Sequence, residues 1–363
     1  MMSNIVIDSH IHSILLLTAS FGQAKKGSVK PLSIAEWAKI GSWLHQHSLD
    51  PSALLDNDLE ETLTGWSDKK ITIERMKILL ARGVSLAISL EKWQRTGLWI
   101  ITKRDEEYPR RFREKLKSKC PPILFGYGEK KLLNHPRGIA IVGARNASET
   151  ELEFANELGS KTAQDGFTVV SGGARGIDQQ AMSGAIKSEG TVVGILADNL
   201  LKASTKSEYR DALLSKDMAL ISPYNPEAPF HVGNAMGRNR YIYCMSDAAV
   251  VVSSTHGKGG TWNGATEVLK NGWTPLWVKQ TKDPDSGNEK LVAQGGNALP
   301  IEPFQVKELA EVDGMKVKKP ELLNTALATD VGDKAVPIGK SRKNQIELFG
   351  DPPQDNSKNI KND

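Results

Sequence analysis

Between residues 98 and 279, short apolar runs alternate with longer amphipathic stretches, and this alternation leaves few folds open to the chain. Ile139–Val142 is followed by Glu149–Asp165, and Thr168–Val170 by Ile177–Lys187. Apolar side chains occupy consecutive positions of each short run, which predicts strands covered on both faces. Strands alternating with helices predict an α/β fold with a doubly wound, mostly parallel sheet. Later runs continue the pattern: Thr191–Leu196, Ala248–Val252 and Thr274–Val278.

A smaller helical module is predicted before this region. Gly83 provides a break between two of its helical stretches, and apolar residues recur at helical spacing at Trp37, Ile40, Trp43 and Leu44. We expect the module to span residues 31–97, after an N-terminal extension at 1–30, and the α/β core to span 98–312. We expect the tryptophans of the module to lie in its own core: Trp37, Trp43, Trp66 and Trp93.

Composition excludes several classes of protein. With 47 Lys and Arg against 43 Asp and Glu, the formal net charge is +4, so a nucleic-acid site requires positive charge gathered on one face. Cys120 and Cys244 supply neither a disulfide framework nor a zinc quartet, which suits the cytoplasm. No run approaches the roughly 18 apolar residues that span a membrane. His10 and His12 lack further ligands in a suitable pattern, so we expect no metal and no cofactor.

Two Gly-rich loops follow predicted strands and suit a phosphate. In the first, Gly143 allows a sharp turn at the strand end, Arg145 offers a forked cation, and the next helix is expected to present free N–H groups. The second combines a hydroxyl, glycines and an arginine: Ser171, Gly172, Gly173 and Arg175. Neither loop has the spacing of a dinucleotide fingerprint or a Walker loop, so P-loop hydrolysis is not predicted. The alternative is that the glycines only close strand–helix turns.

A third group of residues adds to the predicted anion groove. Arg238, Asn239 and Arg240 precede an apolar stretch, and a Gly-rich segment follows the next strand at Lys258, Gly259, Gly260 and Thr261. A solvated basic face would explain any one pair of these cations alone. Together with the two earlier loops, these residues indicate a site for phosphate groups. Trp262, in the same segment, is left open between base stacking and core packing.

These blocks, taken in order, resemble the DprA/Smf family of DNA-processing proteins. The resemblance rests on Tyr108-Pro109, Pro121–Gly126, IVGAR, SGGARGID, GRNR and KGGTW. It implies an extended Rossmann-like fold that binds single-stranded DNA without known catalysis and hands it to a RecA-type recombinase, in DNA processing, recombination and natural transformation. By this match, Arg145, Ser171–Gly173 and Arg238–Arg240 lie at the DNA phosphates. A homodimer is left open.

The chain also departs from the family pattern. Met182 stands where the family usually has His, and Ala197-Asp198-Asn199 replaces a Gly-rich turn. The segment KGGTWNGATE is similar to one in the LOG-like nucleotide hydrolases. An alternative function is therefore a nucleotide-binding sensor or nucleosidase of a prokaryotic defence system, with Glu267 as its acid. Otherwise Glu267 is a helix residue facing solvent.

Residues 313–363 are rich in Lys, Asp, Pro and Asn, which predicts a disordered tail. An apolar island interrupts the tail at residues 345–349. Gln345, followed by Leu348 and Phe349 at plus three and plus four, resembles the bacterial sliding-clamp-binding peptide. We therefore expect these three residues to bind a sliding clamp, with a chance pentapeptide as the alternative.

Overall fold

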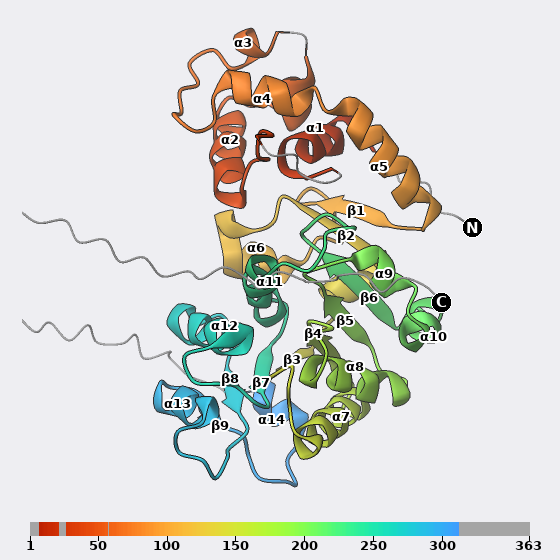
Figure 1. Cartoon of the computed structure of the whole chain (residues 1–363), viewed down its shortest axis with the longest axis vertical. Helices are drawn as coiled ribbons and strands as arrows, with labels where there is room; N and C mark the ends of the chain where they lie inside the picture. The colour runs from red at the N-terminus through yellow and green to blue at the C-terminus, as the bar shows by residue number, and fades with distance from the viewer. Residues whose placement is uncertain (1–6, 22–26, 57, 312–363) are drawn as a thin grey trace, which may run out of the picture. The chain divides into compact units, whose positions relative to one another are not determined.

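The computed structural model describes residues 7–21, 27–56 and 58–311. Its strands form a nine-stranded sheet within these residues, in the order β1-β2-β6-β5-β4-β3-β7-β8-β9 (Figure 1). From β6 to β9 along this order every pairing is parallel, which confirms the doubly wound, mostly parallel prediction. The strands are β1 (Trp99–Thr102), β2 (Ile123–Gly128), β3 (Gly138–Val142), β4 (Thr168–Ser171), β5 (Val192–Ile195), β6 (Met218–Ser222), β7 (Ala248–Val251), β8 (Leu276–Val278) and β9 (Asn297–Ala298).

Each central strand contributes to two hydrophobic cores. Ile139 and Ile141 of β3 belong to one core, and Ala140 and Val142 to the other, because successive side chains of a strand point to opposite faces. Helices α7 and α8 cover the first face, and α11 and α12 cover the second. The helices of this region are α6 (Arg110–Leu116), η2 (Lys117–Lys119), η3 (Lys130–Asn134), α7 (Glu149–Gln164), α8 (Ile177–Lys187), α9 (Leu200–Ser204), α10 (Ser207–Leu214), α11 (Val232–Cys244), α12 (Gly259–Asn271), α13 (Gly287–Ala293) and α14 (Val306–Ala310).

The strand order reverses at β3, which has β4 on one side and β7 on the other. The chain winds from β3 through β4 and β5 to β6, and then returns to continue from β7 to β9 on the opposite side of β3. In open α/β sheets, ligands bind at this reversal, outside the carboxyl ends of the strands. The predicted glycine loops after β3 and β4 and the KGGTW segment after β7 all lie at these ends.

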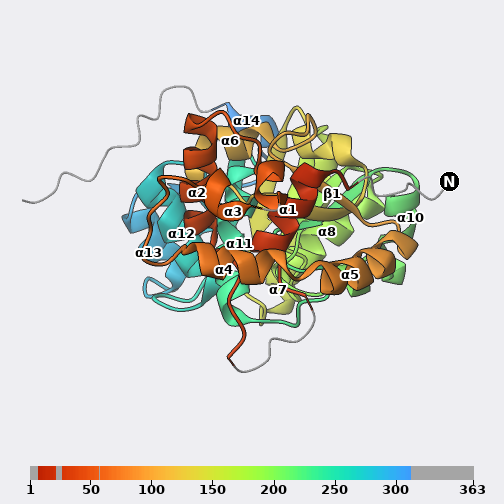
Figure 2. The same cartoon turned by 90° about the horizontal axis from the view of Figure 1, so that it is seen from above.

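The helical module gathers as a bundle of short helices (Figure 2). Its core includes Leu15, Ile40 and Leu79, each fully buried. Leu15 lies in α1, within the segment predicted as an N-terminal extension, so this helix packs as part of the module. The elements are α1 (Ser9–Thr18), α2 (Ile34–Gln46), η1 (Pro51–Leu55), α3 (Leu59–Thr62), α4 (Ile73–Leu80) and α5 (Gly83–Arg95).

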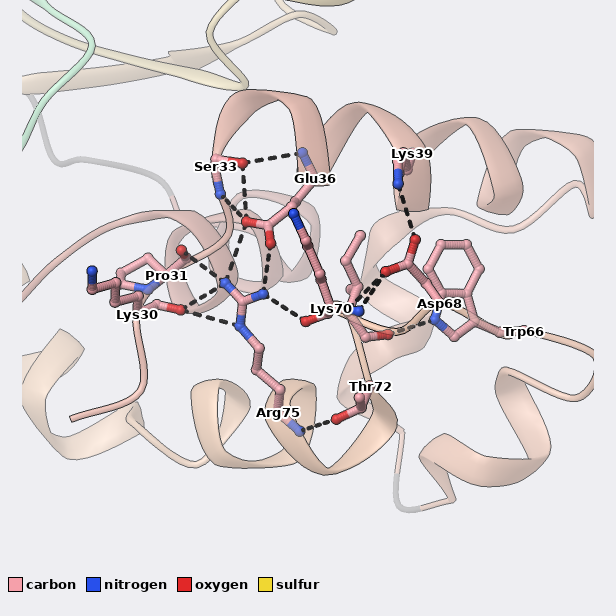
Figure 3. Close-up of polar contacts among 11 residues, drawn as sticks. Lys30, Pro31, Ser33, Glu36, Lys39, Trp66, Asp68, Lys70, Thr72 and Arg75 are labelled. Carbon is pink, nitrogen blue, oxygen red and sulfur yellow. Dashed lines mark hydrogen bonds and ion pairs between the residues drawn. The ribbon is translucent and has the colours of Figure 1, made fainter. Parts of the chain in front are cut away.

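A single arginine joins two segments of this module (Figure 3). Arg75, at the start of α4, donates to the carbonyl oxygens of Lys30, Pro31 and Lys70 and forms a 2.7 Å ion pair with Glu36 of α2. Glu36 also completes a capping box with Ser33, because its carboxylate accepts from the Ser33 amide. The hydrogen bond from Arg75 is the largest influence on the pKa of Glu36, which falls to about 2. This network fixes the entry to α2.

Within the described residues, the module and the sheet belong to one compact unit. Trp93 of α5 packs edge-to-face on Phe125 of β2, with ring centroids 5.3 Å apart, and its indole donates to Glu227. The boundaries predicted for module and core stay predictions. None of the described helices is long and apolar enough to cross a membrane. The predicted clamp motif at residues 345–349 lies outside the described residues.

Candidate nucleic-acid interface

A cavity of about 430 Å³ opens where the strand order reverses. We call it the switch-point cavity. Its lining comes from the loops after β3, β4 and β7, from the first turns of α8 and α12, and from α11 with the segment that leads into it. The lining residues are Val142, Gly143, Ala144, Arg145, Asn146, Ala174, Asp178, Phe230, Val232, Ala235, Met236, Arg238, Asn239, Ser254, Thr255, Lys258, Gly259, Gly260 and Thr261.

A second, smaller cavity of about 280 Å³ adjoins the first. It shares Arg145, Ala174, Phe230 and Arg238 with the switch-point cavity. The remaining lining comes from the loop after β4 and the start of the segment after β5: Gly172, Gly173, Arg175, Ala197 and Asp198. The two cavities therefore bring most of the predicted site residues together, from segments far apart in the sequence.

Gly143 and Gly172 allow the loops to approach their neighbours closely. A Cβ atom at Gly143 would lie 2.5 Å from the side chain of Ile177, so the loop after β3 passes directly over the start of α8. A Cβ atom at Gly172 would lie 1.4 Å from Nη1 of Arg238. The guanidinium of Arg238 therefore lies against the backbone of the second glycine loop, and a side chain at position 172 would require Arg238 and Asp178 to move.

Arg238 is the central cation of the site. Its side chain is buried, yet it lines both cavities, and its Nε and Nη1 atoms have no hydrogen-bond partner among the described residues. The nearest carboxylate is that of Asp178 on α8, with Oδ2 3.9 Å from Nη1. Burial lowers the pKa of Arg238, but a guanidinium keeps its charge in proteins. A buried cation with unused donors is a strong anion-binding group.

Asp178 was not among the predicted site residues, although it ends the SGGARGID motif. Its Oδ1 accepts from the amide of Gly143 at 3.4 Å, which links the loops after β3 and β4. Burial raises the pKa of Asp178, and the nearby Arg238 acts in the opposite direction. This carboxylate therefore compensates Arg238 in part, while orienting the first glycine loop.

Two further arginines stand at the rim. Arg145 is exposed, and its guanidinium lies 4.5 Å from the ring centroid of Phe230. Arg175, also exposed, donates to Oδ1 of Asn146 at 2.8 Å, which joins the first and second glycine loops. Phe230 is 47% exposed and lines both cavities. Its sequence context gave no signal for this role, because a lone aromatic in a loop has no periodicity to interpret.

The helix ends around the cavity differ in their capping. No side chain caps α8 or α12, and the first residues of α12, Gly259–Thr261, line the switch-point cavity. The N-terminus of a helix attracts anions through its amide groups and its dipole. The helix after Gly143 was also expected to present free N–H groups to the site, but no residue of α7 lines either cavity. Ser148 and Glu151 form a capping box there.

Other predicted residues hold the site together. Asn239 donates to the carbonyl of Gly260 at 2.7 Å, and the hydroxyl of Thr261 donates to that of Gly143 at 2.9 Å. Ser171, predicted at a phosphate, is instead buried, donates to the carbonyl of Ile141 at 2.6 Å and lines neither cavity. A strand-end hydroxyl pointing to the neighbouring strand satisfies its own burial and leaves no donor for a ligand.

Arg240 and Glu267 lie apart from the two cavities and pair with each other at 3.2 Å. Because helical residues two positions apart do not share a face, Arg240 diverges from Arg238 on α11. Glu267 therefore does not occupy the position of an acid in the switch-point cavity. Trp262 is only 8% exposed and packs in the core, which decides its role against base stacking.

The residues that depart from the family pattern lie in or near the two cavities. Met182 is fully buried in α8. Its thioether sulfur would lie 3.9 Å from a Cβ atom placed at Gly173, so Met182 packs against the second glycine loop. Asp198 lines the smaller cavity, while Asn199 caps α9 by accepting from the amide of Lys202. Within the described residues there is no group of three or more His, Cys, Asp or Glu placed to hold a metal ion.

Comparisons with known proteins agree with this architecture. The family model described as DNA recombination-mediator protein A matches residues 99–310. The DNA processing protein DprA of Bacillus subtilis is 29% identical over 257 residues, 69% of this chain and 84% of that protein. Protein Smf of Escherichia coli is 31% identical over 234 residues, 60% of this chain and 62% of that protein.

A solved structure supports the fold. The DNA processing protein A of Streptococcus pneumoniae superimposes with a TM-score of 0.62 at 16% identity, covering 81% of this chain and 95% of that one. The family model alone covers more than half of the 363 residues. The chain therefore belongs to the DNA recombination-mediator protein A family, which includes the DNA-processing proteins DprA and Smf.

Proposed function

We propose that this protein binds single-stranded DNA at the switch-point cavity, with a backbone phosphate at the guanidinium of Arg238. The observation that carries the proposal is that this cation is buried, lines both cavities, and has Nε and Nη1 atoms without a hydrogen-bond partner among the described residues. Asp178 is too distant, at 3.9 Å, to satisfy those donors by hydrogen bonding. A phosphate oxygen would satisfy both the charge and the donors.

The surroundings favour a nucleic-acid strand over a free anion. Arg145, Arg175 and Lys258 are exposed cations around the same cavities, so several successive phosphates can be neutralised. Phe230 offers an exposed ring on which a base can stack, and such stacking requires bases that are not paired in a duplex. A concave site of this kind does not present a helix or ribbon to a major groove. We therefore infer sequence-tolerant binding of a single strand.

The test compares oligothymidylate with a duplex of equal length and with mononucleotides, by fluorescence anisotropy. We expect the single strand to bind tightest, and Arg238→Ala to weaken its binding at least tenfold, because a charge-assisted contact in a buried site is lost. Lys187→Ala is the matched control, since Lys187 is an exposed cation at the opposite end of α8. Equal affinities of wild type and Arg238→Ala would contradict the proposal, as would tightest binding of a mononucleotide.

We further propose that the bound strand is passed to a RecA-type recombinase. Support comes from the family, whose description is that of a recombination mediator. The assay follows recombinase filament growth on single-stranded DNA coated with single-strand-binding protein. We expect the wild-type protein to shorten the lag and Arg238→Ala to leave it unchanged. No acceleration by the wild-type protein, with several recombinases, would contradict this step.

A further inference from the structure

A groove of about 830 Å³ borders the helical module, separate from the two cavities already described. We call it the α2 groove. One wall is a face of α2 that carries Ala35, Ala38 and Ser42, whose small side chains leave the space open. Trp43 and Trp66 form an aromatic part of the lining, and Lys119 of η2 and Arg240 of α11 complete it.

The two tryptophans are only partly buried, in contrast to the core position predicted for them. Their rings meet edge-to-face with centroids 5.8 Å apart, and Trp43 also stacks on His47 at 3.9 Å. The indole of Trp66 is held by a hydrogen bond to the carbonyl of Ile71 (Figure 3). The rings are therefore fixed, and each retains exposed surface beside an open groove.

The charged side chains that line the groove are all cations. Its lining includes Lys39, Lys119 and Arg240 and no carboxylate. Lys39 pairs with Asp68 at 3.0 Å, across from Trp66 (Figure 3), whereas Lys119 is exposed. Arg240 pairs with Glu267, but its Nε atom is buried and has no hydrogen-bond partner among the described residues. Fixed aromatic rings beside cations are the combination that binds single-stranded nucleic acid.

Helix α11 contributes lining residues to both the α2 groove and the switch-point cavity. Met236 lines the cavity and is 40% exposed, and Arg240 lines the groove four residues later. Residues four apart are neighbours on one face of a helix, so the two side chains lie side by side. Arg240 is therefore the α11 residue nearest to Met236 on the side of the α2 groove.

We propose that the α2 groove is a second subsite for the same single strand of DNA. Bases stack against Trp43 and Trp66, and Arg240 and Lys119 hold the phosphates between the cavity and the groove. This inference rests on the proposed function, because it extends the path of a strand whose first phosphate lies at Arg238. It assigns a DNA-binding role to the helical module.

The experiment measures binding of oligothymidylates of about 6 and about 20 nucleotides, since only the longer one reaches both subsites. Trp43→Ala is expected to weaken binding of the longer oligonucleotide roughly tenfold through the loss of stacking, and to leave the shorter one unchanged. Trp43→Phe, which keeps a ring, is expected to retain most of the affinity. Thermal unfolding of each variant checks that the module is intact.

Lys119→Ala provides a test that does not disturb packing. We expect it to reduce the slope of log affinity against log salt by about one for the longer oligonucleotide only. Lys117→Ala is the matched control, because Lys117 is exposed in the same short helix and does not line the groove. Wild-type binding of the longer oligonucleotide by both Trp43→Ala and Lys119→Ala would overturn the second subsite.

Arg238→Ala separates the two proposals. If it weakens both oligonucleotides while the groove variants weaken neither, the switch-point cavity stands alone and the second subsite is wrong. If it weakens neither, the proposed function fails at its first phosphate. The extended path then fails with it, whatever the groove variants do.

Discussion

Arg238 and Asp178 face each other across 3.9 Å, from guanidinium Nη1 to carboxylate Oδ2, and both side chains are buried. At this distance the two opposite charges attract each other, but the side chains do not form a hydrogen bond. The carboxylate stabilises the buried guanidinium, but leaves its donors to a ligand. Asp178 thus stabilises the buried Arg238 when no anion is bound at the site.

Asp178→Asn tests this relationship, because it removes the charge and keeps an oxygen for the amide of Gly143. Without DNA, we expect the free energy of unfolding to fall by about 3 kcal/mol, since Arg238 then lies buried without its counter-charge. Saturating oligothymidylate should restore part of that loss, because a phosphate supplies the missing negative charge. Thermal unfolding with and without oligonucleotide measures both effects. Weaker DNA binding than wild type would show that Asp178 acts only by holding the loop.

Arg145 offers a contrasting test at the rim. Because its guanidinium is exposed, Arg145→Ala is expected to leave stability unchanged and to weaken binding of all sequences alike. The slope of log affinity against log salt should fall by about one, as for a single lost phosphate contact. Anisotropy titrations over a range of salt concentrations provide the slope, with Lys187→Ala as the control. A change in sequence preference would instead place Arg145 at a base edge.

The sheet could be predicted from the sequence because its signal is local. Ile139, Ala140, Ile141 and Val142 are apolar at every position, and both faces of β3 are indeed covered. The sequence also predicts that the glycine loops meet at one edge of the sheet, because neighbouring parallel strands end on the same side. By contrast, the antiparallel pairing of β2 with β6 depends on a partner far along the chain.

Whether an individual residue reaches the site depends on the direction in which its side chain points from its helix or strand. The sequence predicts this direction less clearly than it predicts the strands. Arg238 and Arg240 have the same chemistry two positions apart, yet one lines the cavities and the other pairs with Glu267. Ser171 points to β3, where its hydroxyl is used. Trp43 and Trp66 have the apolar character of core residues, and only the assembled fold leaves them beside a groove.

A catalytic test addresses the nucleosidase alternative. We expect no release of base from mononucleotides and no cleavage of DNA or hydrolysis of ATP by the purified protein. The reason is that Glu267 is paired with Arg240 and does not line the switch-point cavity. Chromatography of nucleotides after long incubation is the measurement. Base release that disappears in Glu267→Gln would support the nucleosidase.

The sequence at residues 340–354 makes a separate prediction about a partner. A peptide of this segment should bind the bacterial sliding clamp with micromolar affinity, roughly 8 kcal/mol, because Leu348 and Phe349 fill an apolar cleft while Gln345 forms hydrogen bonds. Replacing both apolar residues by Ala should abolish binding, and the same change in the full chain should leave DNA binding unaltered. Calorimetry that detects no binding at high micromolar concentration would make the motif a chance pentapeptide.

The stability of the fold should depend on pH through His135. This side chain is 3% exposed and packs on Gly138 at the start of β3, near Arg111 and Asp247. Burial, as the largest cause, lowers the pKa of His135 from 6.5 to about 4. Between these values the unfolded chain binds a proton that the folded chain does not, so stability rises with pH across this range and is lost as pH falls.

The loss attributable to this residue is roughly 3 kcal/mol between pH 7 and pH 4. His135→Gln, which is neutral throughout, should be less stable than wild type at pH 7 through lost packing. Its free energy of unfolding should then fall less steeply on acidification. Urea unfolding at intervals across this pH range measures the difference between the two proteins, in which the contributions of unchanged carboxylates cancel. Parallel curves for the two proteins would mean that His135 is protonated in the folded state, in spite of its burial.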